Sequence, residues 1–197
     1  LKSNHSVQTL VLTPSRELAI QIDDVFKSMN TGFKVSCCYG GHKMSIEVNN
    51  LKEPPALLIG TPGRILDHIT RNNFDTTGIH TLVLDEFDKS LELGFQAEMS
   101  AIIERLGFVK KRILTSATKA TEIPEFTGVR NPFVSDYLNE NKVLQGLRCN
   151  IVRSDHKDKL SALFQLLCQL DGEQTLVFCN HRDAAKRVSD SLTDSSV

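Results

Sequence analysis

An apolar run that ends in a cluster of acids constrains the fold more than any other stretch of this sequence. Residues 81–84, Thr-Leu-Val-Leu, lead directly into Asp85, Glu86, Phe87 and Asp88. A short, continuous apolar run is typical of a strand that is buried on both faces of a parallel sheet. In open α/β sheets, ligands bind beyond the carboxyl ends of the strands. The pattern therefore predicts that the three carboxylates emerge at a ligand-binding edge.

These carboxylates need a compensating cation or proton, because clustered negative charges repel one another and lose solvation when they are buried. Magnesium is the natural candidate, since this hard ion binds one or two carboxylates, keeps several waters and bridges substrate phosphates. A plainer interpretation is a solvated acidic turn after a core strand. The acidic stretch alone leaves both interpretations open.

Strands and helices alternate along the first part of the chain. Apolar runs predict strands over 7–13, 34–39, 56–60, 80–84 and 112–115. Helical periodicity and helix-stop residues predict helices over 17–29, near 45–51, over 64–71 and over 95–106. Alternation at this spacing predicts a doubly wound α/β fold, in which helices cover both faces of a parallel sheet.

The pattern loosens after residue 121. A possible strand at 133–136 is followed by a polar stretch without sustained periodicity. We interpret 1–138 as a first domain, 139–146 as a linker and 147–197 as the beginning of a second α/β domain. The second domain is predicted to contain strands near 147–153 and 175–179, and helices over 157–170 and 182–192. It is too short to close a core by itself.

Composition limits the classes of protein to which the chain can belong. Hydrophobic residues make up 40% and charged residues 24% of the 197 residues, as in ordinary globular proteins. No apolar run approaches the roughly 20 residues that span a bilayer, so no membrane partner is expected. The formal net charge is −1, so a nucleic-acid surface would have to be a local patch. Five cysteines without a C-x-x-C pair predict a reducing, cytoplasmic setting. Because the chain begins at Leu1 without a methionine, we expect a piece of a longer protein.

Five short sequences lie at the predicted strand ends. They are Pro14-Ser15-Arg16-Glu17-Leu18-Ala19, Gly40-Gly41, Thr61-Pro62-Gly63-Arg64, Asp85-Glu86-Phe87-Asp88 and Ser116-Ala117-Thr118. Each alone is a common turn or strand end. Together and in this order, they resemble the DEAD-box family of ATP-dependent RNA helicases within superfamily 2. The resemblance runs from motif Ia to motif IV, which residues 176–180 match, and it implies two RecA-like α/β domains, the first without its beginning and the second truncated.

The resemblance implies a role for each acid. Asp85 would hold Mg²⁺ through water, and Glu86 would orient or deprotonate the water that attacks the γ-phosphate of ATP. Asp88 would accept hydrogen bonds from Ser116 and Thr118, in a stiff, charge-assisted link between nucleotide state and RNA binding. These roles suit phosphoryl transfer, in which positioning and electrostatics matter more than covalent chemistry.

The resemblance also implies an RNA path along the other strand ends. Glycines permit close backbone approach, helix N-termini present free N–H groups to phosphate, and hydroxyls and arginine position a strand without reading its bases. Binding should therefore depend on salt and hardly on sequence. The residues are Pro14, Ser15, Arg16, Gly40, Gly41, Thr61, Gly63 and Arg64, with Asn180 from motif IV. Individually, Arg16 and Arg64 would also fit surface ion pairs.

The sequence departs from the family pattern in three ways. Phe87 stands where the family has alanine, so we expect magnesium chemistry beside a reshaped pocket. Ser15 replaces a threonine and keeps the hydroxyl. The phosphate loop G-x-x-x-x-G-K-[ST], the adenine-reading glutamine motif and the later arginine motifs do not occur in the 197 residues. The predicted function is an ATP-dependent RNA helicase that couples ATP hydrolysis to RNA binding and local duplex unwinding, here as an incomplete fragment. The alternatives are a non-catalytic RNA-binding or regulatory module and a related helicase that acts on DNA.

Overall fold

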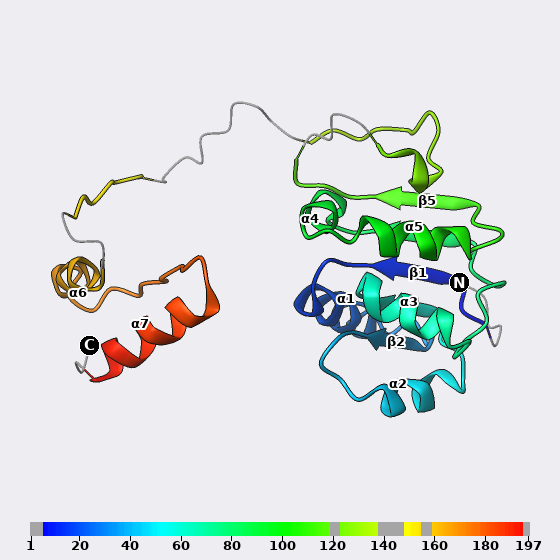
Figure 1. Ribbon diagram of the computed structural model, residues 1–197, viewed down its shortest axis with the longest axis horizontal. Helices are drawn as coiled ribbons and strands as arrows, with labels where there is room; N and C mark the ends of the chain where they lie inside the picture. Colours follow the sequence, from blue (N-terminus) through cyan, green and yellow to red (C-terminus); the bar gives the residue numbers. More distant parts are fainter. Residues whose placement is uncertain (1–5, 119–122, 138–147, 155–158, 195–197) are drawn as a thin grey trace. The chain divides into compact units, whose positions relative to one another are not determined.

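A computed structural model describes residues 6–118, 123–137, 148–154 and 159–194. Contacts between residues divide the chain into two units, Leu1–Glu140 and Asn141–Val197. The division falls inside the predicted linker, all of which lies outside the described residues. Figure 1 shows the ribbon of each unit.

A parallel sheet of five strands forms the first unit, in the order β2-β3-β1-β4-β5. The strands are β1 (Thr9–Leu12), β2 (Val35–Cys38), β3 (Leu57–Gly60), β4 (Thr81–Leu84) and β5 (Lys111–Leu114). Leu10 pairs in register with Leu58 on one side and Leu82 on the other, so that three leucines share one face of the sheet. Each strand lies within the range predicted for it or within one residue of it.

Helices connect the strands in the alternation that the sequence predicts. The helices of this unit are α1 (Arg16–Ser28), α2 (Met44–Leu51), α3 (Pro62–Thr70), α4 (Phe87–Glu92) and α5 (Gln96–Glu104), followed by a short 3₁₀ turn, η1 (Glu125–Thr127). The Ser15 hydroxyl accepts a hydrogen bond from the Leu18 N–H and caps α1. Pro62 occupies the first turn of α3, where its missing N–H costs nothing.

Helices cover both faces of the sheet with separate apolar clusters. On one face, Leu10, Leu58 and Leu82 pack with Ile65 of α3 and Ile102 of α5. On the other face, the apolar residues packed together are Val11, Ala19, Leu57 and Ile59, with Ile22 and Phe26 of α1 beside them. The predicted doubly wound α/β fold is therefore confirmed for this unit.

The carboxyl ends of all five strands are joined by backbone hydrogen bonds. In sheet order they run from Thr61 N–H to the Cys38 carbonyl (3.2 Å), Thr13 to Gly60 (3.0 Å), Asp85 to Leu12 (2.9 Å) and Thr115 to Leu84 (3.1 Å). The residues that follow the strands therefore lie along one continuous edge. Every predicted site residue of the first unit lies on this edge or just after it.

Three predictions of secondary structure are wrong, and one helix was not predicted. Helix α4 begins directly after the acids, and its six residues are too few to show a helical period. The possible strand at 133–136 is irregular. Residues 148–154 and 175–179 also form no strand, and residue 147 lies outside the described part. A strand needs a neighbouring strand to hydrogen-bond its backbone, and Phe178 remains 87% exposed.

The second unit contains two helices in its described part, α6 (Leu160–Gln169) and α7 (Arg182–Asp194). Both match predicted helices within about three residues. Neither helix has a buried residue, so the described residues of this unit form helices without a buried core. Among the described residues of the whole chain, no helix is long and apolar enough to cross a membrane.

Candidate functional site

Asp85 is held at the end of β4 by a threonine of the neighbouring strand. Its backbone N–H donates to the Leu12 carbonyl, and its Oδ1 accepts a hydrogen bond of 2.6 Å from the Thr115 hydroxyl. The Thr115 Oγ1 in turn accepts from the Glu86 N–H at 3.1 Å. Asp85 Oδ2 has no hydrogen bond to any described residue, which leaves this oxygen of the half-buried residue available to a ligand.

Glu86 adopts a left-handed backbone conformation, with φ 44° and ψ 53°, immediately before α4. This conformation is rare for a residue other than glycine and is found preferentially at functional sites. The Phe87 N–H donates to the Thr115 carbonyl at 2.9 Å and holds the turn from the following side. The Glu86 carboxylate makes no hydrogen bond to the described residues, so it is presented at the edge beside Asp85.

Asp88 is linked to the segment that follows β5. Its Oδ2 accepts from the Thr118 hydroxyl at 2.7 Å and from the Thr118 N–H at 3.2 Å. The Ser116 hydroxyl donates to the Thr118 carbonyl at 2.6 Å, so its part in the predicted link is mainly indirect. The Thr118 hydroxyl lowers the pKa of Asp88, with a smaller contribution from Ser116, and the acid is charged at neutral pH.

Phe87 points away from the acids and into the core. It is buried, and its ring centroid lies 6.2 Å from that of Phe126 in a tilted arrangement. Among the described residues, the bulky side chain at the position of the expected alanine therefore packs within the apolar cluster that also contains Met99. We expected a reshaped pocket next to the acids, and the structure places the extra volume in the core instead.

The ends of β1 and β2 bring an arginine next to the glycine pair. The Arg16 guanidinium lies over the Tyr39 ring, 5.9 Å from its centroid. Gly41 has φ +85°, which favours glycine, and a Cβ there would lie 3.9 Å from Arg16 Nη1. Arg16 also lies 3.5 Å from the exposed Glu17 carboxylate, the surface ion pair that we had kept as an alternative. A weak, exposed pair of this kind does not prevent the guanidinium from binding phosphate.

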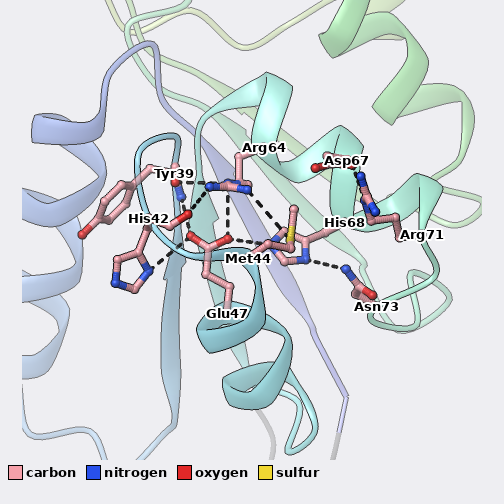
Figure 2. A network of polar contacts seen from close by, with 9 residues as sticks. All are labelled: Tyr39, His42, Met44, Glu47, Arg64, Asp67, His68, Arg71 and Asn73. Carbon is pink, nitrogen blue, oxygen red and sulfur yellow. Dashed lines mark hydrogen bonds and ion pairs between the residues drawn. The ribbon is translucent and has the colours of Figure 1, made fainter.

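Arg64 is turned toward the β2–α2 loop rather than toward solvent (Figure 2). Its Nε donates to the Tyr39 carbonyl at 3.1 Å and lies 3.3 Å from Glu47 Oε2, and a terminal nitrogen donates to the His42 carbonyl at 2.6 Å. The side chain of Arg64 is only 15% exposed. The ion-pair interpretation therefore holds for Arg64, but the pair is buried.

Glu47 is the buried partner in this network. Its side chain is 1% exposed, and Oε1 accepts from the Tyr39 N–H at 3.1 Å. Its Oε2 lies 2.8 Å from His68 Nε2, and the Asn73 side-chain amide lies 2.9 Å from the other ring nitrogen of His68. Figure 2 shows the carboxylate between the loop and α3. Each oxygen of the buried carboxylate thus has a hydrogen-bond donor.

Cys38, Glu47 and His68 are buried and place one ligand atom each within 4.8 Å of one another. These residue types bind metals, but here the Glu47 carboxylate and the His68 ring are already hydrogen-bonded. The carboxylate and both ring nitrogens have the protein partners given above, and Arg64 supplies a positive charge. Burial also raises the pKa of the Cys38 thiol, which disfavours the thiolate that a metal requires. The arrangement is that of a satisfied polar network.

The remaining predicted residues occupy simpler positions. Pro14 is buried in the turn after β1, while Thr61 precedes α3 and its hydroxyl does not cap that helix. Gly40 and Gly63 are exposed, and a Cβ on either would meet nothing within 4 Å. Asn180 is exposed just before α7 in the second unit.

Sequence reasoning missed two residues of the site. The sequence pattern predicts Thr115 only as a strand residue, although it directly follows β5 and precedes Ser116-Ala117-Thr118. Glu47 lies in a helix with a weak periodic signal, and nothing in its neighbours in the sequence indicates burial. Only the contacts with Tyr39 and His68, 8 and 21 residues away, reveal its position.

Comparison with known proteins now adds to this geometry. The sequence model of the DEAD/DEAH box helicase family matches residues 1–126, which is more than half of the 197 residues. The chain belongs to the DEAD/DEAH box helicase family. The matched region contains the acids, the Thr115–Thr118 segment and the arginine–glycine surface of Arg16, Gly40, Gly41 and Gly63.

Relatives of this DEAD/DEAH box protein align along nearly its whole length. A protein of Methanocaldococcus jannaschii named a probable ATP-dependent RNA helicase is 31% identical over 98% of this chain and 52% of its own length. The ATP-dependent RNA helicase eIF4A of Mycosarcoma maydis is 33% identical over 95% of this chain and 47% of its own. The chain therefore spans about half the length of these relatives.

A solved structure supports the same assignment of the fold. The crystal structure of a DEAD box protein from the hyperthermophile Methanococcus jannaschii superimposes with a TM-score of 0.59 and 29% identity, covering 97% of this chain and 52% of that one. An archaeal structure from Sulfolobus tokodaii, titled as a hypothetical ATP-dependent RNA helicase, has a TM-score of 0.55 and 29% identity over 62% of this chain and 36% of that one. The RecA-like α/β fold predicted from the sequence is confirmed for the first unit.

Proposed function

We propose that this protein acts in an ATP-dependent RNA helicase, in which ATP hydrolysis drives RNA binding and local duplex unwinding. One observation carries the proposal. A continuous carboxyl edge of the sheet presents the acids after β4 beside the arginine–glycine surface after β1, β2 and β3. Membership of the helicase family and the names of both relatives support it.

Glu86 is the residue that we assign to water activation. Its carboxylate has no hydrogen-bonded partner among the described residues, and its strained backbone fixes where the side chain begins. In the hydrolysis of ATP, a water oxygen forms a bond to the γ-phosphorus while the bond to the departing ADP oxygen breaks. Glu86 would orient this water and take its proton, a contribution of about 10²–10⁴-fold in rate.

Asp85 fits a magnesium site, because its oxygens are the hard ligands that this ion prefers. The Thr115 hydroxyl occupies Oδ1 and fixes the orientation of the carboxylate, while Oδ2 is available. When bound, Mg²⁺ would neutralise charge on the phosphates. Asp88 and Thr118 would tie the acidic turn to the segment after β5, so that a change at the nucleotide moves that segment.

RNA would lie along Arg16, Gly40, Gly41 and the start of α3. The exposed glycines leave room for a phosphate backbone, and the free N–H groups at the start of α3 favour its negative charge. Arginine side chains and backbone N–H groups suit contacts with phosphate, which carry no sequence information, so we propose sequence-independent contacts.

The test is RNA-stimulated ATP hydrolysis by the full-length product of the gene, with the 197-residue chain assayed in parallel. We expect hydrolysis that RNA stimulates, and a Glu86→Gln variant that loses at least 10²-fold in kcat while it still binds ATP and RNA. Glu92→Gln, at the end of the helix that follows Glu86, is the matched control, because Glu92 is exposed and its ion pair among the described residues is with Lys89. RNA binding without hydrolysis would favour the non-catalytic module, and stimulation by DNA alone would favour a DNA helicase.

A further inference from the structure

We propose that Glu47 is a positioning residue for RNA binding, which holds the β2–α2 loop and Arg64 in the conformation that receives the RNA backbone. In this arrangement Arg64 links α3 to the loop and does not bind phosphate itself. The inference rests on the proposed function, because it concerns the RNA surface of the same protein.

Glu47 is buried next to the β2–α2 loop. The loop it supports, residues 39–43, carries both Gly40 and Gly41, whereas Glu47 itself is buried one helical turn into α2. Its Oε1 accepts from the Tyr39 N–H at 3.1 Å, and His42 Nδ1 lies 3.7 Å from the same oxygen. One carboxylate oxygen thus contacts the loop on both sides of the glycine pair.

The Arg64 guanidinium is hydrogen-bonded to the same loop. Its Nε is shared between the Tyr39 carbonyl and Glu47 Oε2, at 3.1 and 3.3 Å, and its terminal nitrogens reach the His42 carbonyl at 2.6 Å and the Met44 sulfur at 3.9 Å. The planar guanidinium therefore spans the loop from Tyr39 to Met44 (Figure 2). A phosphate that bound these nitrogens would have to displace the loop that the RNA also needs.

His68 and Asn73 fix the orientation of Glu47 itself. His68 Nε2 lies 2.8 Å from Oε2, and the Asn73 amide holds the opposite ring nitrogen at 2.9 Å. His68 is fully buried on α3, five residues after the exposed Gly63. These contacts, which run through Asn73, His68, Glu47 and Arg64, therefore join α3 to the β2–α2 loop that carries Gly40 and Gly41. A buried carboxylate with every oxygen occupied has one stable orientation, since any other leaves a charge unpaired.

Glu47→Gln gives the decisive test, because two explanations predict opposite signs. The variant removes one negative charge near an RNA surface, so simple charge repulsion predicts tighter binding. An amide, however, cannot accept hydrogen bonds at both ends, so one of its ends must face the Tyr39 N–H or the Arg64 and His68 donors with a donor of its own. If Glu47 positions the loop, RNA binding becomes weaker, by about tenfold.

The experiment measures RNA affinity of the full-length protein by titration with an unstructured single-stranded RNA at several salt concentrations. Glu53→Gln is the matched control, because it makes the same charge change just beyond α2 at a side chain that is 88% exposed. Thermal unfolding and ATP affinity without RNA are measured on each variant, and amide ¹H–¹⁵N signals of Gly40 and Gly41 report on the loop directly. We expect shifted glycine signals, weaker RNA binding and unchanged ATP affinity for Glu47→Gln alone.

Arg64→Lys and Arg64→Ala distinguish a structural link between α3 and the loop from direct phosphate binding by Arg64. They also test the inference if Glu47→Gln fails to fold. A lysine keeps the charge but cannot reach two carbonyls and a carboxylate from one plane. If Arg64 links α3 to the loop, both variants bind RNA weakly with the wild-type salt dependence. A phosphate ligand predicts near-normal binding by Arg64→Lys, and a salt slope reduced by about one in Arg64→Ala; that result would overturn the inference.

Two further outcomes distinguish this inference from the proposed function. If wild-type protein binds RNA and Glu47→Gln binds it equally or more tightly, the positioning role is wrong while the proposed function stands. If wild-type protein does not bind RNA, the proposed function fails and the positioning role fails with it.

Discussion

Phe87 lies within the acidic turn but contributes to the core. Its buried ring packs against Phe126, so we predict that Phe87→Ala lowers the free energy of unfolding by about 3–5 kcal/mol through loss of apolar contacts and the cavity left behind. Urea unfolding of the 197-residue chain measures this change. Phe108→Ala is the control, because that ring is 78% exposed and its removal should cost less than about 0.5 kcal/mol. Equal losses for the two variants would place Phe87 outside the core.

Asp88 makes the stability of the folded protein depend on pH in the acid range. The Thr118 hydroxyl lowers the pKa of Asp88, so the folded protein holds the charged form more favourably than the unfolded chain does. The resulting stability is fully present above about pH 4 and is lost as the pH falls through the lowered pKa. We expect its size to stay below about 1 kcal/mol, because the carboxylate is largely solvated.

Thr118→Val provides the measurement for Asp88. An NMR titration of the Asp88 side-chain carboxyl carbon should show its pKa rising toward the ordinary value of an aspartate in the variant. Ser116→Ala is the comparison and should move it less, because the Ser116 hydroxyl donates to the Thr118 carbonyl. A larger rise in Ser116→Ala than in Thr118→Val would contradict the geometry of this link.

Individual site residues were predictable where strand ends place them and not where distant partners do. Asp85, Glu86 and Asp88 follow a visible apolar strand, so that parallel-sheet geometry brings them to the ligand edge. The role of Arg64 could not be predicted in the same way, because its orientation depends on Glu47, 17 residues earlier in the sequence, and on burial of that acid. Burial of a charged residue is decided by tertiary packing, which hydrophobic periodicity does not encode.

Gly63, in the first turn of α3, tests the RNA surface at the scale of an element. A Cβ at this position meets nothing within 4 Å and the backbone is helical, so the fold has no need for glycine here. We predict that Gly63→Ala raises stability, by up to about 1 kcal/mol, while it weakens RNA binding by on the order of tenfold, because the methyl group occupies the space of the RNA backbone.

Gly107→Ala is the matched control for this prediction. Its Cβ would also meet nothing within 4 Å, and it follows α5 at the opposite ends of the strands from the proposed RNA path. RNA titrations combined with thermal unfolding separate the two effects. Unchanged RNA affinity in Gly63→Ala would remove the start of α3 from the proposed path.

The elements themselves show where sequence patterns suffice. The five strands of the first unit were predicted because each is an apolar run that a neighbouring strand completes, as Leu10 is completed by Leu58 and Leu82. Residues 175–179 have an equally apolar pattern and form no strand, since the described residues of the second unit offer no partner strand. A run of apolar residues thus specifies a strand only when the chain also supplies its neighbours.

At the scale of the whole chain, the two units differ in what protects their backbones. In the first unit, α3 buries Ile65, His68 and Ile69 against the sheet, whereas α6, of nearly equal length, buries no residue. Amide hydrogens exchange slowly where opening requires loss of buried contacts. We therefore predict that α6 and α7 exchange far faster than α3 in the 197-residue chain.

Hydrogen exchange followed by mass spectrometry measures this directly, with α3 as the internal control for helix length. Protection of α3 should approach that of β1 and β4, because their opening requires loss of the same apolar cluster. Protection in α6 should be close to that of an isolated short helix, which is marginal in water. If α6 were as protected as α3, the second unit would have a packed core, and the apolar run at 175–179 would be the first segment to examine as its source. Slow exchange confined to the first unit would instead mean that the sheet carrying the acids and the glycine loop is the part of this chain that folds by itself.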